Sequence, residues 1–324
     1  MNKPERKGGA VKIVHQAAYE GKAPLLKGNL HTHTTRSDAI SSPETVIGQY
    51  AAMGYDFLAL TDHRLYNYQN FAPESGLLIL PGMELDANLP GPGCHCVHLV
   101  SLGPEKERGN RFEQDQAFES LSVSSAQEAL PLVRAIEEAG NLPIFCHPEW
   151  SGNTAQEILS LPDISLMEIW NSGCVVENGL DAHAAYWDEV LCAGRRMYGV
   201  ASDDGHHPYQ NGLGFVKVRA EKTPSAILDA LRRGAFYASC GPEIYDFYLE
   251  DDKAVLFCSP VEVIRFRHFR VPYVERRGNG IMGHQTAPVK GTNYIRAEVM
   301  DAQGRMAWTN PLFLDEKYWQ RAKK

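Results

Sequence analysis

A short histidine-rich stretch near the N-terminus has the composition of a metal-binding site. His31 and His33 are two residues apart behind the apolar Leu30, so on a β-strand both imidazoles would point to the same face. Asp38 follows after a short polar loop. Two imidazoles and a carboxylate form the mixed nitrogen and oxygen set that suits zinc, manganese or iron. A strand with two hydrogen-bonded histidines is the alternative for this stretch alone, and the rest of the chain decides between them.

Further along the chain, apolar runs typical of buried strands end repeatedly in residues that can bind metals. Helix signals such as the Ser42-Pro43 start and the Gly54 stop lie between the runs. Strand and helix alternate about seven times, which is the pattern of a parallel barrel with its site at the C-terminal strand ends. Nine imidazoles and carboxylates there would be costly to bury unpaired, and metal ions would remove that cost. These nine residues are His31, His33, Asp38, His63, Glu84, His98, His147, Asp204 and His206.

The pattern changes near residue 243, where short strands follow one another without helices. Asp301–Gly304 is a hairpin-turn signal between two of them. We therefore predict an α/β barrel that carries a metal site over residues 1–242 and a small antiparallel, β-sandwich-like domain over residues 243–324. Capping boxes are expected at Ser125 and Thr154. Strands outside the barrel series are expected at residues 11–14, 244–249, 254–257, 261–266, 294–299 and 307–308.

Composition limits the class of protein. A chain of 324 residues with 44% hydrophobic and 22% charged residues is long and apolar enough for a large globular core. The net charge of −8 argues against a general nucleic-acid binder. Seven cysteines without a Cys-x-x-Cys pair make a disulfide framework or a thiolate zinc site unexpected. With no apolar run long enough to span a membrane, a cytoplasmic location is expected.

Taken in order, the motifs resemble those of the polymerase-and-histidinol-phosphatase (PHP) family of metallohydrolases. The resemblance covers roughly residues 28–242, and residues 201–204, 236–245 and 308–311 are similar to the branch that includes carbaryl hydrolase. It implies a distorted (β/α)7 barrel and a cluster of up to three divalent ions (Mn, Zn or Fe). The motifs are His31-x-His33, Asp38, Thr61-Asp62-His63, Gly82-Met83-Glu84, His95-x-x-His98, His147-Pro148 and Asp204-x-His206.

The resemblance also implies which ligands each ion would share. Glu84 would bridge two ions, because two divalent charges held close together need an anion between them. A metal-bridging hydroxide, its pKa lowered towards roughly 7, would be the nucleophile. The three ligand sets would be His31, His33, Glu84 and Asp204; Glu84, His98 and His147; and Asp38, His63 and His206.

Two ligand assignments have alternatives. His95 could replace His98, but residues three apart on a strand face opposite sides, and the resemblance favours His98. Asp203 could replace Asp204, although the spacing to His206 favours Asp204. Cys94 and Cys96 flank His95, but thiolates do not belong to the ligand set of this family.

Several neighbouring residues are weaker candidates for a role in the site. Arg36, Arg64 and His207 could clamp a phosphate or protonate a leaving group, and an exposed loop position explains each of them equally well. Trp150 and Tyr209 follow strand ends and could line a pocket, although core packing is the better explanation for the tryptophan.

These observations predict a metal-dependent hydrolase, with a phosphomonoesterase as the first hypothesis and Glu84, His207 and Arg36 as its catalytic residues. Hydrolysis of a carbamate, ester or amide on the same metal cluster is the alternative chemistry. A non-catalytic metal-binding scaffold is the alternative class. The expected partner is a small phosphate ester rather than a membrane or a nucleic acid, and self-association is compatible with the sequence.

Overall fold

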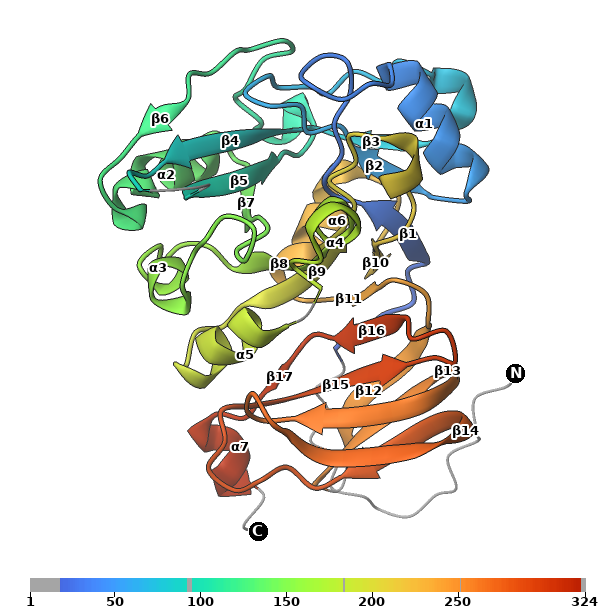
Figure 1. Ribbon diagram of the computed structural model, residues 1–324. Coiled ribbons are helices and arrows are strands. Elements are labelled where there is room, and N and C mark those ends of the chain that lie inside the picture. Colours follow the sequence, from blue (N-terminus) through green and yellow to red (C-terminus); the bar gives the residue numbers. More distant parts are fainter. Residues whose placement is uncertain (1–17, 92–94, 183, 251, 322–324) are drawn as a thin grey trace.

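The computed structural model describes residues 18–91, 95–182, 184–250 and 252–321 (Figure 1). Within them the protein has a mixed α/β fold built on two sheets, which confirms the predicted α/β class. The strand expected at residues 11–14 and Cys94 lie outside the described residues. No helix in the described part of the chain combines the length and the apolar character needed to cross a membrane.

The larger sheet has eleven strands and begins in the N-terminal half. Strands β1, β2 and β3 are parallel, whereas β10 is antiparallel to both β1 and β11. This part of the sheet contains, in spatial order, β3 (Leu78–Leu80), β2 (Phe57–Ala59), β1 (Leu25–Asn29), β10 (Phe215–Arg219) and β11 (Phe236–Ser239).

The second sheet has six strands and mixes both directions. Strands β7, β8 and β9 are parallel, but β5 is antiparallel to both β4 and β7. The described residues between β4 and β5 form no helix, and antiparallel neighbours need no crossover connection. The described strands thus form two sheets rather than one ring of seven parallel strands. In spatial order this sheet contains β6 (Leu121–Ser122), β4 (Gly82–Asn88), β5 (Cys96–Leu102), β7 (Leu142–Phe145), β8 (Leu166–Asn171) and β9 (Tyr198–Ser202).

Short helices connect these strands, and two of them begin at the predicted capping residues Ser42 and Thr154. Ser42 caps α1 by accepting the Thr45 N–H, and the Thr154 capping box forms at α3. The box expected at Ser125 was wrong, because residues 126–129 form a 3-10 turn and Glu128 accepts the Ser124 N–H instead. The sequence analysis did not predict α4. The helices are α1 (Pro43–Ala52), α2 (Leu130–Glu138), α3 (Ala155–Leu159), α4 (Ser172–Asn178), α5 (Ala185–Cys192) and α6 (Pro224–Arg232).

The C-terminal strands pair antiparallel throughout and lie in the lower part of Figure 1. Two strands predicted at residues 254–257 and 261–266 are one strand, because the pairing with β14 shifts register around Pro260 and accommodates it. Strand β16 also pairs with β11, so the large sheet continues into this region, and a domain boundary near residue 242 stays a prediction. The elements are β12 (Ile244–Glu250), β13 (Lys253–Arg267), β14 (Pro272–Thr286), β15 (Tyr294–Met300), β16 (Met306–Thr309), β17 (Leu312–Phe313) and α7 (Glu316–Arg321).

The two sheets approach each other just beyond their strand ends. Thr32, after β1, forms a parallel bridge with Gly205, after β9. A second bridge joins His63, after β2, to Glu84 in β4. The Asp204 N–H donates to the carbonyl oxygen of His31 at 2.8 Å. These backbone contacts bring the polar ends of both sheets together at one place.

Candidate metal centre

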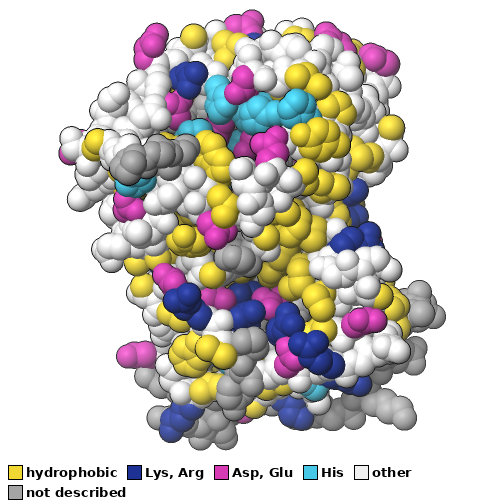
Figure 2. Space-filling view, in the orientation of Figure 1, with side chains coloured by type: hydrophobic (Ala, Val, Ile, Leu, Met, Phe, Trp, Pro, Cys, Tyr) yellow, Lys and Arg dark blue, Asp and Glu magenta, His cyan; other side chains and the backbone are white. Residues whose placement is uncertain are grey.

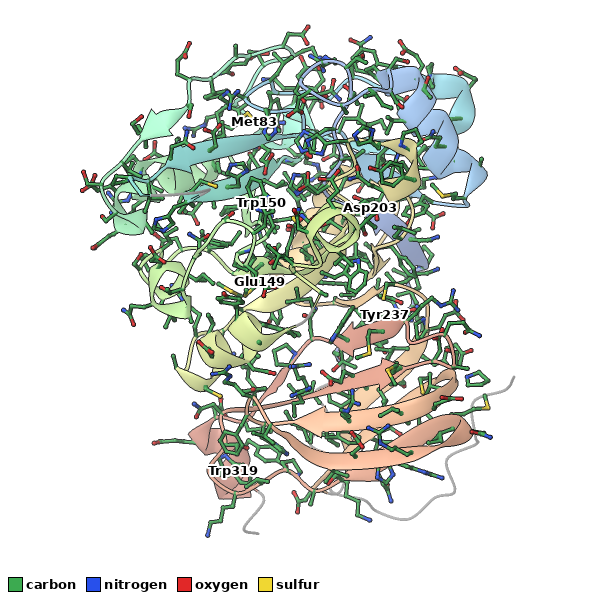
Figure 3. All side chains as sticks on the ribbon, in the orientation of Figure 1. Met83, Glu149, Trp150, Asp203, Tyr237 and Trp319 are labelled. Atoms are coloured by element: carbon green, nitrogen blue, oxygen red, sulfur yellow. The ribbon has the colours of Figure 1, made fainter. Side chains whose placement is uncertain are left out.

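The nine predicted ligand residues meet where the two sheets join. Figure 2 shows imidazoles gathered on the upper half of the molecule. In Figure 3, Trp150 and Asp203 lie in that half, far from Trp319 on α7. The ligand residues come from six places: His31, His33 and Asp38 after β1; His63 after β2; Glu84 in β4; His98 in β5; His147 after β7; Asp204 and His206 after β9.

His31 and His33 face the same carboxylates. Their Nε2 atoms lie 3.2 and 2.9 Å from Asp204 Oδ1. Each is also 3.4 Å from an oxygen of Glu84. The two Nε2 atoms are 3.1 Å apart, so side chains of four residues, two histidines and two carboxylates, converge on one small volume.

A second group lies on the other side of Glu84. Glu84 Oε1 is 2.8 Å from His98 Nδ1 and 3.3 Å from His147 Nε2. His147 has a φ of 25°, an uncommon conformation for a residue with a side chain, and it follows directly after β7 and Cys146. This backbone turn accompanies an imidazole that reaches past the neighbouring strand β5 to Glu84 in β4.

The third group is the most open. Asp38 Oδ2 is 3.3 Å from His63 Nε2, and Asp38 Oδ1 is 3.3 Å from His206 Nε2. The geometry adds His33 to this group, since donor atoms of all four residues lie within 4.8 Å of one another. The His33 ring lies 4.3 Å from that of His206 and 4.4 Å from that of His63. His33 therefore stands between two groups that the sequence assigned separately.

Glu84 is at the centre of the cluster, and its surroundings fit metal ions. Its oxygens lie within 3.4 Å of five imidazoles, those of His31, His33, His63, His98 and His147. Three buried ligand atoms nevertheless make no hydrogen bond: Glu84 Oε2, Asp204 Oδ1 and His63 Nδ1. Glu84 Oε2 and His63 Nδ1 are 2.8 Å apart but are not aligned as donor and acceptor. Buried, unpaired oxygen and nitrogen atoms that converge on common points are what divalent ions such as Zn²⁺ or Mn²⁺ require.

The electrostatics of the cluster keep its carboxylates ionised. Burial raises the pKa of Glu84, but His31, His98 and His63 outweigh burial and hold this pKa well below its ordinary value. Burial likewise lowers the pKa of His31, while Asp204 and Glu84 outweigh it and raise the pKa well above its usual range. Glu84 thus stays charged despite full burial, and it can accept cations without first losing a proton.

A buried carboxylate outside the nine, Glu168 in β8, orients the ligands. Its Oε1 lies 2.8 Å from His31 Nδ1 and accepts the Ser202 hydroxyl. Its Oε2 accepts the His147 backbone N–H at 2.8 Å and the Asn171 amide at 2.9 Å. With Nδ1 of His31 occupied by Glu168, Nε2 is the ring nitrogen that faces the site, and it can bind a metal ion once it has lost its proton. The sequence analysis missed Glu168, although a charged residue inside the apolar run 165–170 was a signal for it.

The structure distinguishes the alternatives that the sequence left open. Asp203 is fully buried and points away from the histidines, where it accepts hydrogen bonds from Asn29, Tyr50 and Ser172 and from the backbone of residues 212–214. Asp204 is the aspartate that faces the cluster. His95 lies outside the cluster, where its Nε2 is 3.1 Å from Glu157 Oε1.

The structure also separates the weaker candidates into those that line a cavity and those that do not. A cavity of about 330 Å³ opens over the cluster, and His207 and Trp150 line it. Arg36 does not line it, because its guanidinium donates to Asn67 and Asp115 and lies over the Phe71 ring. Arg64 pairs with Asp86, again outside the lining. His207 therefore lines the cavity over the cluster, whereas Arg36 is not among the described lining residues.

Comparisons with known proteins give short or distant matches. No family model matches the sequence. A 115-residue segment is 35% identical to a 5′-3′ exoribonuclease of Haemophilus influenzae, covering 34% of this chain and 38% of that protein. A DNA polymerase III of the PolC type from Oceanobacillus iheyensis is 24% identical over 258 residues, which are 75% of this chain and 16% of the polymerase. The chain thus matches well under half the length of either protein.

Solved structures resemble the fold only loosely. A two-domain protein from Bacteroides vulgatus, described as containing a predicted PHP-like metal-dependent phosphoesterase, has a TM-score of 0.49 and 15% identity, covering 95% of this chain and all of its own. A protein from Bifidobacterium adolescentis, described as a metal-dependent phosphoesterase, has a TM-score of 0.42 and 15% identity. The match covers 66% of this chain and 98% of that protein. An amidohydrolase from Chromobacterium violaceum has a TM-score of 0.39 and 18% identity. The match covers 55% of this chain and 87% of the amidohydrolase. Because these TM-scores are low, the structures carry no weight in assigning the function.

Proposed function

We propose that this protein is a metal-dependent hydrolase that acts on phosphate esters. The observation that carries the proposal is the position of Glu84, a fully buried carboxylate that five imidazoles surround and whose Oε2 has no hydrogen bond. The match to a protein named 5′-3′ exoribonuclease supports phosphoester chemistry, since ribonucleases break phosphate ester bonds.

We further propose that the ligand sets implied by the PHP resemblance hold up to three divalent ions, with His33 placed to contact the third set as well as the first. The two sheets, joined by the bridges at Thr32 and His63, would then be the distorted barrel of that family. Divalent ions bound there supply Lewis acidity and lower the pKa of water towards roughly 7. The nitrogen and oxygen donors suit Mn²⁺, Zn²⁺ or Fe²⁺.

In the proposed reaction, water adds to the phosphorus atom while the bond from phosphorus to the alcohol oxygen breaks. The attacking water loses a proton and the departing alkoxide gains one, so that the products are an alcohol and inorganic phosphate. His207 lines the cavity without belonging to a ligand set, and it is the residue placed to donate the proton to the alkoxide. Asp204, Glu84 and their imidazole partners hold the reacting phosphate group in place by binding the ions.

A monoester is a better substrate for this cavity than a nucleic acid. No lysine or arginine is among the described residues that line the cavity, whereas binding along a polynucleotide needs cationic side chains for successive phosphates. A cavity of about 330 Å³ accommodates a small molecule with one terminal phosphate. The same cluster could instead hydrolyse a carbamate, ester or amide. Assaying a panel of such compounds beside phosphate esters distinguishes the two activities.

The proposal is tested by incubating manganese-loaded protein with phosphate monoesters, a short RNA, aryl carbamates and aryl esters. We expect phosphate release from a monoester and its loss in Asp204→Ala and Glu84→Gln variants that still fold. Turnover of carbamates or esters alone would assign the alternative chemistry. RNA cleavage without monoester turnover would contradict the preference for a small substrate. If none of the compounds is hydrolysed, a non-catalytic scaffold would be favoured.

A further inference from the structure

The walls of the cavity carry negative charge beyond the metal ligands. Glu177 of α4 lines the cavity outside the nine ligand residues, and its Oε1 accepts the Gln210 amide at 2.7 Å. The lining residues described include four carboxylates, those of Asp38, Glu84, Glu177 and Asp204, and no cationic side chain of Lys or Arg. The bound ions can offset the charge of one phosphate group, but a second phosphate near Glu177 would meet only repulsion. The part of the substrate that lies outside the metal cluster should therefore be uncharged.

An aromatic stack extends from the cavity towards solvent. The rings of His207 and Tyr209 lie 5.3 Å apart at an interplanar angle of 9°. His207 lines the cavity, while the side chain of Tyr209 is 59% exposed. One ring of the stack thus lines the cavity, and the other lies outside the lining, stacked on the first and exposed to solvent, where an uncharged substituent that leaves the cavity past His207 could reach it.

The loop that carries this stack is fixed before any ligand binds. Gln210, in the 3-10 turn Pro208–Gln210, is almost fully buried, and its Oε1 accepts the backbone N–H groups of both His206 and His207 at 2.8 and 2.7 Å. Its amide nitrogen donates to Glu177. Asn211 donates to Gln49 of α1 at 2.8 Å. The loop backbone is thus ordered in advance, and the Tyr209 ring packs on that of His207, which reduces the conformational freedom lost when a ligand stacks there.

The surface around the loop is apolar as well. Among the described residues, ten large hydrophobic side chains are exposed, and five of them lie in this loop or in segments next to it. The Ile40 N–H donates to the His206 carbonyl oxygen, and Met53 packs against Gly212 so closely that a β-carbon there would lie 2.3 Å from its sulfur. In Figure 2, hydrophobic side chains adjoin the imidazoles on one side. The five side chains are those of Ile40, Met53, Val176, Tyr209 and Leu213.

We propose that the substrate is a phosphate monoester whose alcohol carries a planar aromatic ring and no second phosphate, and that Tyr209 determines this specificity by stacking on that ring. The proposal rests on the proposed function and adds the class of leaving group to it. It follows from three features in and beside the cavity: a described lining without lysine or arginine, an exposed ring that stacks on a lining residue, and an apolar surround.

The test compares two esters of primary alcohols that differ only in the planarity of the ring, benzyl phosphate and cyclohexylmethyl phosphate. We expect the manganese-loaded protein to prefer benzyl phosphate by about two- to tenfold in kcat/KM, mostly through KM, which is the range of a single aromatic contact. Tyr209→Phe should keep this preference. Tyr209→Ala and Tyr209→Leu should reduce the ratio to about one. Tyr245→Ala on β12, which removes a tyrosine that is 48% exposed, is the matched control and should change nothing.

Binding of benzylphosphonate and cyclohexylmethylphosphonate, measured by calorimetry on metal-loaded protein, gives a readout that does not need turnover. If no phosphate ester is hydrolysed, the proposed function fails, and a Tyr209-dependent preference for benzylphosphonate would still support the stacking site. Equal affinity for the two phosphonates, or equal turnover of the two esters by the wild-type protein, would overturn the inference. So would a Tyr209→Ala variant that lost activity on both esters alike, because Tyr209 would then act by positioning His207.

Discussion

Replacing Glu168 with glutamine tests the geometry of the metal centre without removing a ligand. Four donors converge on the Glu168 carboxylate: Ser202 and His31 on Oε1, and His147 N–H and the Asn171 amide on Oε2. Glutamine keeps the size but turns one oxygen into an NH2 group. If the NH2 group takes the place of Oε2, it faces the His147 backbone N–H and the Asn171 amide NH2, which are donors and cannot accept a hydrogen bond from it. If it faces Oε1's partners, the proton of His31 must move from Nδ1 to Nε2, the atom that should bind metal.

The magnitude follows from these two outcomes. Loss of a carboxylate that orients a metal-binding histidine typically costs about 10- to 100-fold in metal affinity, and Glu168 also holds the backbone of His147. We therefore expect Glu168→Gln to weaken metal binding by at least about tenfold, or about 1.4 kcal/mol. In the metal-free protein, the loss of one hydrogen bond to a charged group should lower the free energy of unfolding by about 1.5–3 kcal/mol.

The assay is a competition titration of Zn²⁺ or Mn²⁺ against a chelating indicator, with urea unfolding of the chelator-treated protein in parallel. Glu189→Gln, at a partly exposed carboxylate that pairs with Arg270, is the matched control and should leave metal affinity unchanged. A folded Glu168→Gln variant that bound metal within about twofold of the wild type would refute the reasoning, since that is well short of the expected loss.

Three further outcomes are expected. Removing metal with a chelator should lower the unfolding temperature. Adding Mn²⁺ at about 1,000 times its Kd should raise the free energy of unfolding by about 4 kcal/mol, measured by calorimetry. An equal increase in the Asp204→Ala variant would contradict the proposed metal site. Asp188→Ala should cost about 3 kcal/mol or more in urea unfolding, because the buried Arg296 loses both of its hydrogen bonds to Asp188 and keeps the pairing with Glu298. Arg270→Ala at an exposed pair should cost about 1 kcal/mol or less, and equal losses would contradict this. Burial raises the pKa of Asp181 to about 6 against the pull of two backbone N–H groups, so its carboxyl holds a proton in the folded state that the unfolded chain releases near pH 4. Wild-type stability should therefore fall by up to about 3 kcal/mol, relative to Asp181→Asn, as pH rises from about 4 through 6, and a difference that does not change with pH would contradict this assignment.

The sequence predicted the local elements better than their arrangement. The Ser42-Pro43 start of α1 and the Thr154 capping box depend on residues within one turn, and both form as predicted. The direction of strand pairing depends on partners far along the chain, so the antiparallel neighbours of β5 were not foreseen. Strand β14 was missed because its side chains are mostly exposed and show no period-2 alternation, while Pro260 made one strand look like two.

For the candidate site, sequence order identified residues that the structure brings together, but not how they share ligands. The place of His33 between two groups depends on how closely the loop after β9 packs on the loop after β1, which motif spacing does not encode. The same limit applies to Glu168 and Asp203. One orients ligands and the other holds the loop at residues 212–214, and both act through hydrogen bonds to segments distant in sequence.

The metal centre and the junction of the two sheets occupy the same place, and this links metal binding to stability. His31 and His33 follow a strand of the large sheet, whereas Glu84 and Asp204 belong to or follow strands of the other. An ion bound by all four would therefore add a connection between the sheets, beside the backbone bridges and the buried apolar side chains that already join them. Part of the binding free energy then appears as resistance to separation of the sheets. The unpaired oxygens of Glu84 and Asp204, which are a cost to the metal-free fold, are what make the centre selective for cations.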